Sequence, residues 1–163
     1  MSYINDRIFN TVLTADDSTA KEELGSFRFE GGKVYKYVYF ADAVTAAIGA
    51  PVIMDGTYNY KVTVDVSEGA GVGSVAGVAI TTNTPLYYGW VQIYGAATVK
   101  VTDYITAGDG LIASGTDLFW AKGADTFASD TAVVVTAHKA GAYALATSGT
   151  DANATITAFI RCM

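Results

Sequence analysis

The chain has 163 residues, a net charge of −6 at pH 7, and a composition that is 51% hydrophobic but only 16% charged. A chain of this length builds one domain, or one domain with an arm, and needs neither a disulfide nor a metal to hold its core. The few basic residues form no cluster, which argues against nucleic-acid binding. The low charged fraction is typical of proteins that hide surface in an oligomer or a larger assembly.

The first residues and the single cysteine bear on the compartment. Cys162 is the one cysteine, so the chain cannot form an internal disulfide. The start of the sequence lacks the basic-then-apolar pattern of a signal peptide, and no run of 18 apolar residues predicts a membrane span. We therefore expect a protein that is made in a cytoplasm, stays there or in a particle assembled there, and has no membrane partner.

Residues 1–24 differ from the rest of the chain. Their apolar side chains follow neither a helical nor a strand period, which is typical of an extended arm. Thr19 and Glu22 have the spacing of a capping box and Gly25 follows, so one short helical turn is expected at 20–24. We predict that this N-terminal arm contacts neighbouring proteins. The residues expected to make these contacts are Tyr3, Ile4, Arg7, Ile8, Phe9, Val12 and Leu13.

From residue 25 onward the pattern is one of short strands separated by Gly, Asp and Asn. Two aromatic-rich runs flank Gly31 and Gly32, which predicts a β-hairpin. Residues 58–66 alternate apolar and polar side chains and predict a strand with one buried face and one polar face. Further strands are expected at 75–82, 86–94, 98–102, 111–113, 118–120, 132–136 and 154–162. Together they predict an all-β domain, a small barrel or a sandwich, over residues 25–163.

Motifs that carry chemistry are weak in this sequence. Residues 71–76 have the spacing of a dinucleotide-binding loop, but β-prone residues follow where that site requires a helix. His138 is the only histidine, and with Cys162 it offers too few ligands for zinc. A nucleophilic Cys162–His138 pair is the one enzymatic arrangement left open. We predict a protein that is not an enzyme and that has no catalytic residue, cofactor or metal.

Aromatic residues are numerous, with eleven Tyr, seven Phe and two Trp, and several of them gather at 87–94. We assign this aromatic cluster to the barrel core and to a subunit interface, where aromatic side chains are enriched, with Tyr87, Tyr88 and Trp90 as the interface candidates. An exposed row of these rings could also stack on sugars, so a carbohydrate-binding module is an alternative.

Two parts of the sequence resemble the head decoration, or cement, proteins of tailed bacteriophages. The first is the run LGSFRFEGGKVYKYV at 24–38, which leads into an Ala-rich stretch. The second lies within 88–111, where YGWVQIYG is followed by VKV and then by AGDGL. The resemblance covers roughly residues 24–161, and it is interrupted by a Gly-rich loop at 68–77 and an insert at 125–130.

The resemblance implies a small β-barrel or β-tulip domain that forms a homotrimer and binds the outside of an assembled capsid. In that role residues 25–163 would be the decoration domain, and the arm would reach neighbouring subunits. The partner would be the major capsid protein, whose subunits the protein would bridge and stabilise. The protein would be made in the host cytoplasm and reside on the virion surface. Another virion β-protein, such as a head fibre or a tail-tube subunit, is the alternative within the virion.

Overall fold

A computed structural model describes residues 9–41, 44–55, 60–65, 75–102, 104–114, 118–123, 141–149 and 154–162. Within these ranges all regular elements are strands, so the predicted all-β fold is confirmed. The first half of the chain holds β1 (Asp16–Asp17), β2 (Phe27–Glu30), β3 (Lys33–Phe40), β4 (Pro51–Met54), β5 (Lys61–Thr63) and β6 (Val75–Ala79). The second half holds β7 (Tyr88–Val101), β8 (Gly110–Ala113), β9 (Trp120–Lys122), β10 (Ala142–Ala144) and β11 (Ala154–Arg161). The described residues contain no helix of the length and hydrophobicity needed to cross a bilayer.

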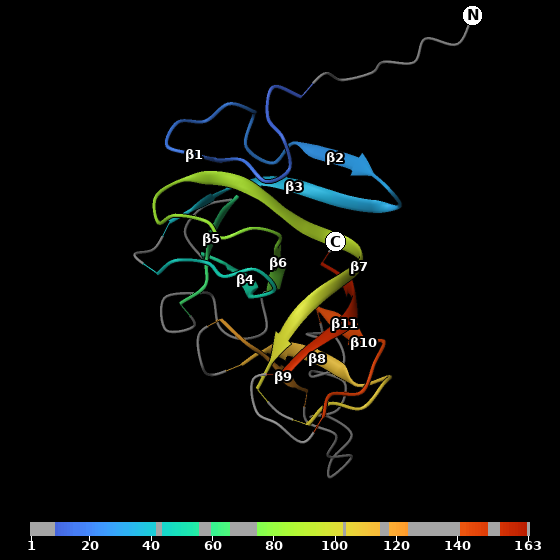
Figure 1. Cartoon of the computed structure of the whole chain (residues 1–163). Coiled ribbons are helices and arrows are strands. Elements are labelled where there is room, and N and C mark those ends of the chain that lie inside the picture. Colours follow the sequence, from blue (N-terminus) through green and yellow to red (C-terminus); the bar gives the residue numbers. More distant parts are fainter. Residues whose placement is uncertain are drawn as a thin grey trace, which may run out of the picture.

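The long strand β7 belongs to two closed rings of strands (Figure 1). In the first ring β7 pairs with β3 and β6, and β4 and β5 complete the circle. In the second ring β7 pairs with β9 and β11, and β8 and β10 complete it. The described strands therefore form two five-stranded barrels that share one strand, which makes the fold a barrel rather than a sandwich. β2 is attached to β3 outside the first ring.

The two barrels meet where β7 changes partners. β3 pairs with β7 as far as Tyr94, and β11 pairs with it from Tyr94 to Val101. Gly95 lies at this change with a φ of 97°, a conformation that residues with a Cβ rarely adopt. A Cβ at this position would also lie 3.1 Å from the carbonyl oxygen of Gly32. Gly95 therefore allows one strand to leave the first barrel and enter the second.

The side chain of Gln92 holds this bend. Its Nε2 lies 3.1 Å from the carbonyl oxygens of Tyr94, Gly95 and Ala96, and the side chain is fully buried. We expect Gln92→Leu to lower the free energy of unfolding by about 1–3 kcal/mol, because carbonyl oxygens lose their donor. Urea unfolding measures the change, and Thr98→Ala, at an exposed position of the same strand, should alter stability by about 0.5 kcal/mol or less. Equal stability of Gln92→Leu and the native protein would contradict this role.

Each barrel has its own apolar core. Inward-facing side chains of the first barrel include Val38, Phe40, Val52, Val62 and Val91. Those of the second barrel include Val99, Leu111, Trp120, Ala158 and Ile160. The alternation predicted for 154–162 is confirmed, since β11 buries every second residue from Ile156 to Ile160.

The hairpin prediction is also confirmed. Glu30 pairs with Lys33, so Gly31 and Gly32 form a two-residue turn between β2 and β3. Both glycines have positive φ, 59° and 76°, as the turn that matches strand twist requires. The strands predicted at 86–94 and 98–102 are one continuous strand, β7.

Two local predictions are wrong. Residues 20–24 form no helical turn; instead the N–H of Ser26 donates to the carbonyl of Glu23 across a turn in which Gly25 has a φ of 83°. The polar face predicted for 58–66 fails at Thr63, which is buried because its neighbours β3 and β4 close around β5. Its hydroxyl accepts a hydrogen bond from the N–H of Asp65 at 2.9 Å, which satisfies it without solvent. The strand expected at 132–136 lies outside the described residues.

Candidate interaction surface

Residues 9–24, which we call the N-terminal strap, cross the outer face of the first barrel (Figure 1). Their short strand β1 pairs with the start of β7. Phe9 packs edge-on against Trp90, with ring centroids 5.3 Å apart. The indole N–H of Trp90 donates to the hydroxyl of Thr11 at 2.9 Å. The strap therefore covers Trp90, which is completely buried.

Charged side chains fasten the strap to the barrel. The guanidinium of Arg28 donates to the carbonyl oxygen of Thr11 at 2.9 Å. The carboxylate of Glu22 accepts the N–H of Thr11 at 3.1 Å, which joins the two ends of the strap. The carboxylate of Asp16 accepts the N–H of Thr84 at 3.0 Å and so ties β1 to the loop before β7. These contacts explain why the strap lies along the barrel although it has no helical or strand period of its own.

The structure places the predicted arm residues in different surroundings. Phe9 and Leu13 pack against the aromatic cluster of the protein's own barrel, whereas Val12 is 67% exposed. The described part of the predicted arm thus packs on the barrel more closely than the sequence suggests. Contact with neighbouring proteins stays a prediction. Four of the predicted contact residues lie outside the described part of the chain: Tyr3, Ile4, Arg7 and Ile8.

The aromatic residues assigned to a subunit interface are divided between the interior and the surface. Trp90 lies inside the protein, between Phe9 and Tyr37. Tyr88 packs beside Tyr37 and is half-buried, as is Tyr87. Only Tyr87 and Tyr88 therefore reach the surface, and the same burial removes Trp90 from any row of rings that could stack on a sugar.

Strand β2 carries two exposed phenylalanines because it overhangs the first barrel. Phe27 lies opposite Lys36 and Phe29 opposite Val34, so both rings point to the side of the sheet that holds the barrel core. Since β2 lies outside the ring, no strand among those described covers this side of it. Phe27 is 48% exposed and Phe29 is 77% exposed.

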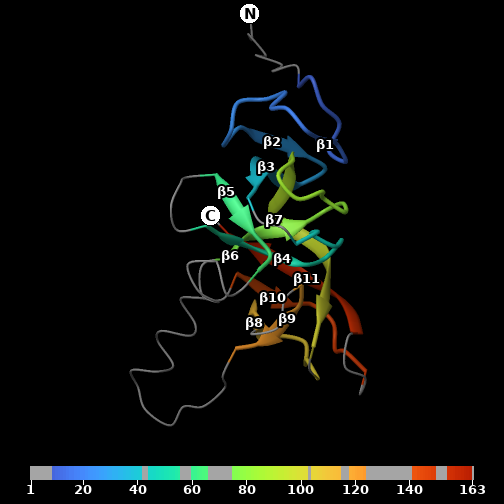
Figure 2. The same cartoon turned by 90° about the vertical axis from the view of Figure 1, so that its left-hand side faces the viewer.

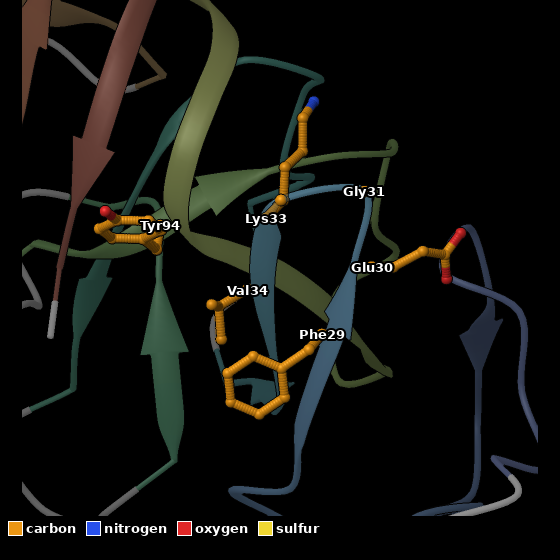
Figure 3. Close-up of a pocket in the computed structure, with 7 residues that line it drawn as sticks. Phe29, Glu30, Gly31, Lys33, Val34 and Tyr94 are labelled. Carbon is orange, nitrogen blue, oxygen red and sulfur yellow. The ribbon is translucent and has the colours of Figure 1, made fainter. Parts of the chain in front are cut away.

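A shallow hollow of about 400 Å³ lies at the tip of the β2–β3 hairpin (Figure 3). Phe29, Val34 and Tyr94 give it apolar walls, while the charged ends of Glu30 and Lys33 point away from it. We call Phe27, Phe29, Val34 and Tyr94 together the hairpin patch. An exposed apolar surface of this kind is a candidate site of interaction with another macromolecule.

A second group of apolar side chains is exposed at the opposite end of the molecule. The second barrel, with β8, β9 and β10, lies at the far end from β2 in both views (Figures 1 and 2). Its exposed apolar side chains are Tyr104, Tyr143 and Leu145, which we call the distal patch. Hydrogen bonds between residues 105–108 and 144–148 join the segments that carry Tyr104 and Leu145. The protein therefore offers apolar contact surface at both ends of its long axis.

The candidate reactive residues give no reactive centre in the described part of the chain. Burial raises the pKa of the Cys162 thiol to about 12, and its Sγ lies 3.2 Å from the carbonyl oxygen of Gly141. A thiol is nucleophilic only as the thiolate, which such a pKa suppresses. His138 lies outside the described residues. Residues 75–79 form strand β6, so the β-prone character predicted after the glycine-rich spacing is confirmed.

We expect Cys162 to react slowly with iodoacetamide near neutral pH in the folded protein. A pKa of about 12, against the ordinary value of 9.0, leaves about a thousandfold less thiolate than in the unfolded chain. The measurement is the alkylation rate by mass spectrometry, with the urea-unfolded protein as the control. Because the chain has one cysteine, the signal needs no assignment. Similar rates in the two states would show that the thiol is not shielded.

Sequence reasoning missed the hairpin patch, although part of its signal is present. In the run Phe-Arg-Phe-Glu of β2, alternation places both rings on one face and both charges on the other. The same alternation is found in strands that bury their aromatic face in a core. The missing information is that β2 lies outside the ring, which no residue within β2 reveals. Of the described residues, none form a cluster of three or more potential metal ligands.

The amino-acid sequence matches no protein-family model and no curated protein. The fold is similar to a solved structure described as the crystal structure of head fiber gp8.5 N base in bacteriophage phi29. The two share 14% sequence identity and superpose with a TM-score of 0.50, over 78% of this chain and 95% of that chain. At this level of identity, the comparison establishes a shared β fold.

Proposed function

We propose that this protein is a structural component of a bacteriophage virion, bound to the outside of the assembled head. The observation that carries the proposal is the likeness of its fold to the base of a phage head fibre, over almost the whole of that base. The resemblance of residues 24–161 to head decoration proteins rests on sequence and supports the same location. Both lines of support concern proteins of the phage head.

The exposed surfaces suit a protein that bridges subunits of the shell. The hairpin patch and the distal patch lie at opposite ends of the molecule, so one copy can make apolar contacts at two places. Individually weak contacts made at several points give high overall avidity. We propose that these contacts, made with the major capsid protein and between neighbouring copies of this chain, bridge subunits of the major capsid protein and stabilise the shell. A homotrimer, as the sequence resemblance implies, would multiply them.

A second candidate within the virion is the base of a head fibre. The observation that favours it is the coverage of 95% of the phi29 fibre base by this fold. A fibre base and a decoration protein differ in what is attached to them on the head. Cryo-electron microscopy of intact heads separates the two, since density of the size of this chain alone fits decoration and density continuing outward fits a fibre.

The test of the proposed location is antibody–gold labelling of virions purified from cells that express this gene together with its neighbours. We expect the protein in the particles by mass spectrometry and gold on their heads. Particles lacking the protein would contradict the virion proposal, and gold confined to tails would contradict the head. Heads formed without the protein should lose their DNA at a lower temperature than complete heads if it stabilises the shell.

Removing the distal patch is expected to weaken binding to purified heads. In the double variant Tyr104→Ala/Leu145→Ala, two exposed apolar side chains are lost, and binding should weaken by about tenfold or more. Co-sedimentation with heads that lack the protein measures the effect. Ile48→Ala is the matched control, because Ile48 is similarly exposed but lies in neither patch. Equal binding by the double variant and the control would exclude this patch from the shell contact.

A further inference from the structure

Within the described part of the chain, strand β2 presents a free edge. Glu30 and Lys33 flank a two-residue turn and so bond to each other, and the N–H of Tyr37 donates to the carbonyl of Ser26. The main-chain groups of Arg28 and Glu30 therefore bond to β3. The main-chain N–H and C=O groups of Phe27 and Phe29 point away from β3. Among the described strands, β3 is the only partner of β2.

This edge lacks several of the features that protect a strand from pairing with another strand. Proteins blunt open edges with short strands, charged side chains, proline, bulges or a covering segment. β2 is short and carries Arg28 and Glu30, but it contains no proline and its pairing with β3 is regular. Its exposed face carries Phe27 and Phe29, which add apolar surface beside the open main chain.

The charges of β2 are arranged so that the strand complements a second copy of itself. Arg28 and Glu30 lie on one face, with Nη2 2.7 Å from Oε2, on either side of Phe29 along the strand. In an antiparallel pair centred on Phe29, Arg28 of each copy lies opposite Glu30 of the other. The neighbouring two-fold register is centred on Arg28 and sets like charges directly opposite each other, which destabilises a pair.

We propose that β2 pairs antiparallel with β2 of a second copy of this chain, about a two-fold axis at Phe29. The Phe29 rings of the two copies meet on one face, and four alternating charges lie on the other. The contact is small, so it forms weakly between free molecules and gains strength where many copies stand side by side. The next step rests on the proposed function. On a phage head, this contact joins copies that are held by neighbouring shell subunits, and it is separate from a trimer contact.

Disulfide trapping in the purified full chain tests the pairing. In a Cys162→Ala background, Phe29→Cys places two thiols opposite each other, with Cα atoms about 5.5 Å apart, within the range of a disulfide. Phe27→Cys is the matched control, because it lies on the same exposed face but opposite Gly31 of the partner. Under mild oxidation we expect Phe29→Cys to form the covalent dimer about tenfold faster or more, through its higher effective concentration. Equal rates, or faster trapping at Phe27, would overturn the proposal.

Charge reversal in the Phe29→Cys protein separates pairing from a general effect on folding. Glu30→Arg sets arginines opposite each other and should abolish the fast trapping, whereas Glu30→Gln should retain it; Arg28 is left unchanged because it also holds the strap. Equal trapping by Glu30→Arg and Glu30→Gln, with unchanged circular dichroism, would overturn the register. The virion test is independent of the trapping test. If the protein is absent from virions but Phe29→Cys still traps the dimer, only the proposed function is overturned. If the protein is present in virions but no dimer is trapped, only this inference is overturned.

Discussion

Trp120→Ala is expected to lower the free energy of unfolding by about 3–5 kcal/mol, a larger loss than for Gln92→Leu. Trp120 is completely buried in the core of the second barrel. Its indole N–H also donates to the carbonyl oxygen of Gly49 at 3.1 Å, and that carbonyl accepts the N–H of Lys100 on β7 as well. The alanine variant therefore creates a cavity and removes a tie between the two barrels.

Two further variants separate the cavity from the hydrogen bond. Trp120→Phe keeps much of the ring but lacks the donor, and we expect a smaller loss than for alanine, of which about 1 kcal/mol comes from the hydrogen bond. Tyr104→Ala removes an exposed aromatic side chain from the same barrel and should change stability by about 0.5 kcal/mol or less. Urea unfolding followed by circular dichroism is the suitable measurement, since tryptophan fluorescence changes with the substitution itself. A native-like midpoint for Trp120→Ala would show that this core is not closed.

The double variant Phe9→Ala/Leu13→Ala is expected to lower the free energy of unfolding by about 2–4 kcal/mol, because both partly buried side chains cover Trp90 and its neighbours. The Phe9→Ala change also removes the contact between the Phe9 ring and the guanidinium of Arg28, which lies 5.4 Å from the ring centre. Val12→Ala is the control, since Val12 lies in the same strap but is 67% exposed. A loosely attached arm would leave stability unchanged in both variants. That result, together with weakened binding to heads, would favour an arm that contacts neighbouring subunits over one packed on its own barrel.

Local chemistry made much of this fold predictable from sequence. The turn at Gly31 and Gly32 needs two residues with positive φ, and glycine supplies both wherever the segment occurs. The alternation in β11 reports its buried face directly, because successive side chains of a strand point to opposite sides. The same local rules are silent about the strap, whose position depends on the contacts of Thr11 with Arg28, 17 residues away, and with Trp90, 79 residues away.

The sequence by itself determined that the chain is all-β, where most of its strands lie, and that one hairpin turns at two glycines. Only the tertiary structure decided which strands close the rings, and with them which aromatic residues are buried. Trp90 and Phe29 both lie in aromatic-rich strands, yet one is enclosed and the other is the most exposed large hydrophobic side chain described. The physical reason is that ring closure pairs β7 with strands that lie far apart in the sequence, from β3, which begins at Lys33, to β11, which ends at Arg161. Such pairing depends on contacts between distant segments, which local propensity and alternation do not encode.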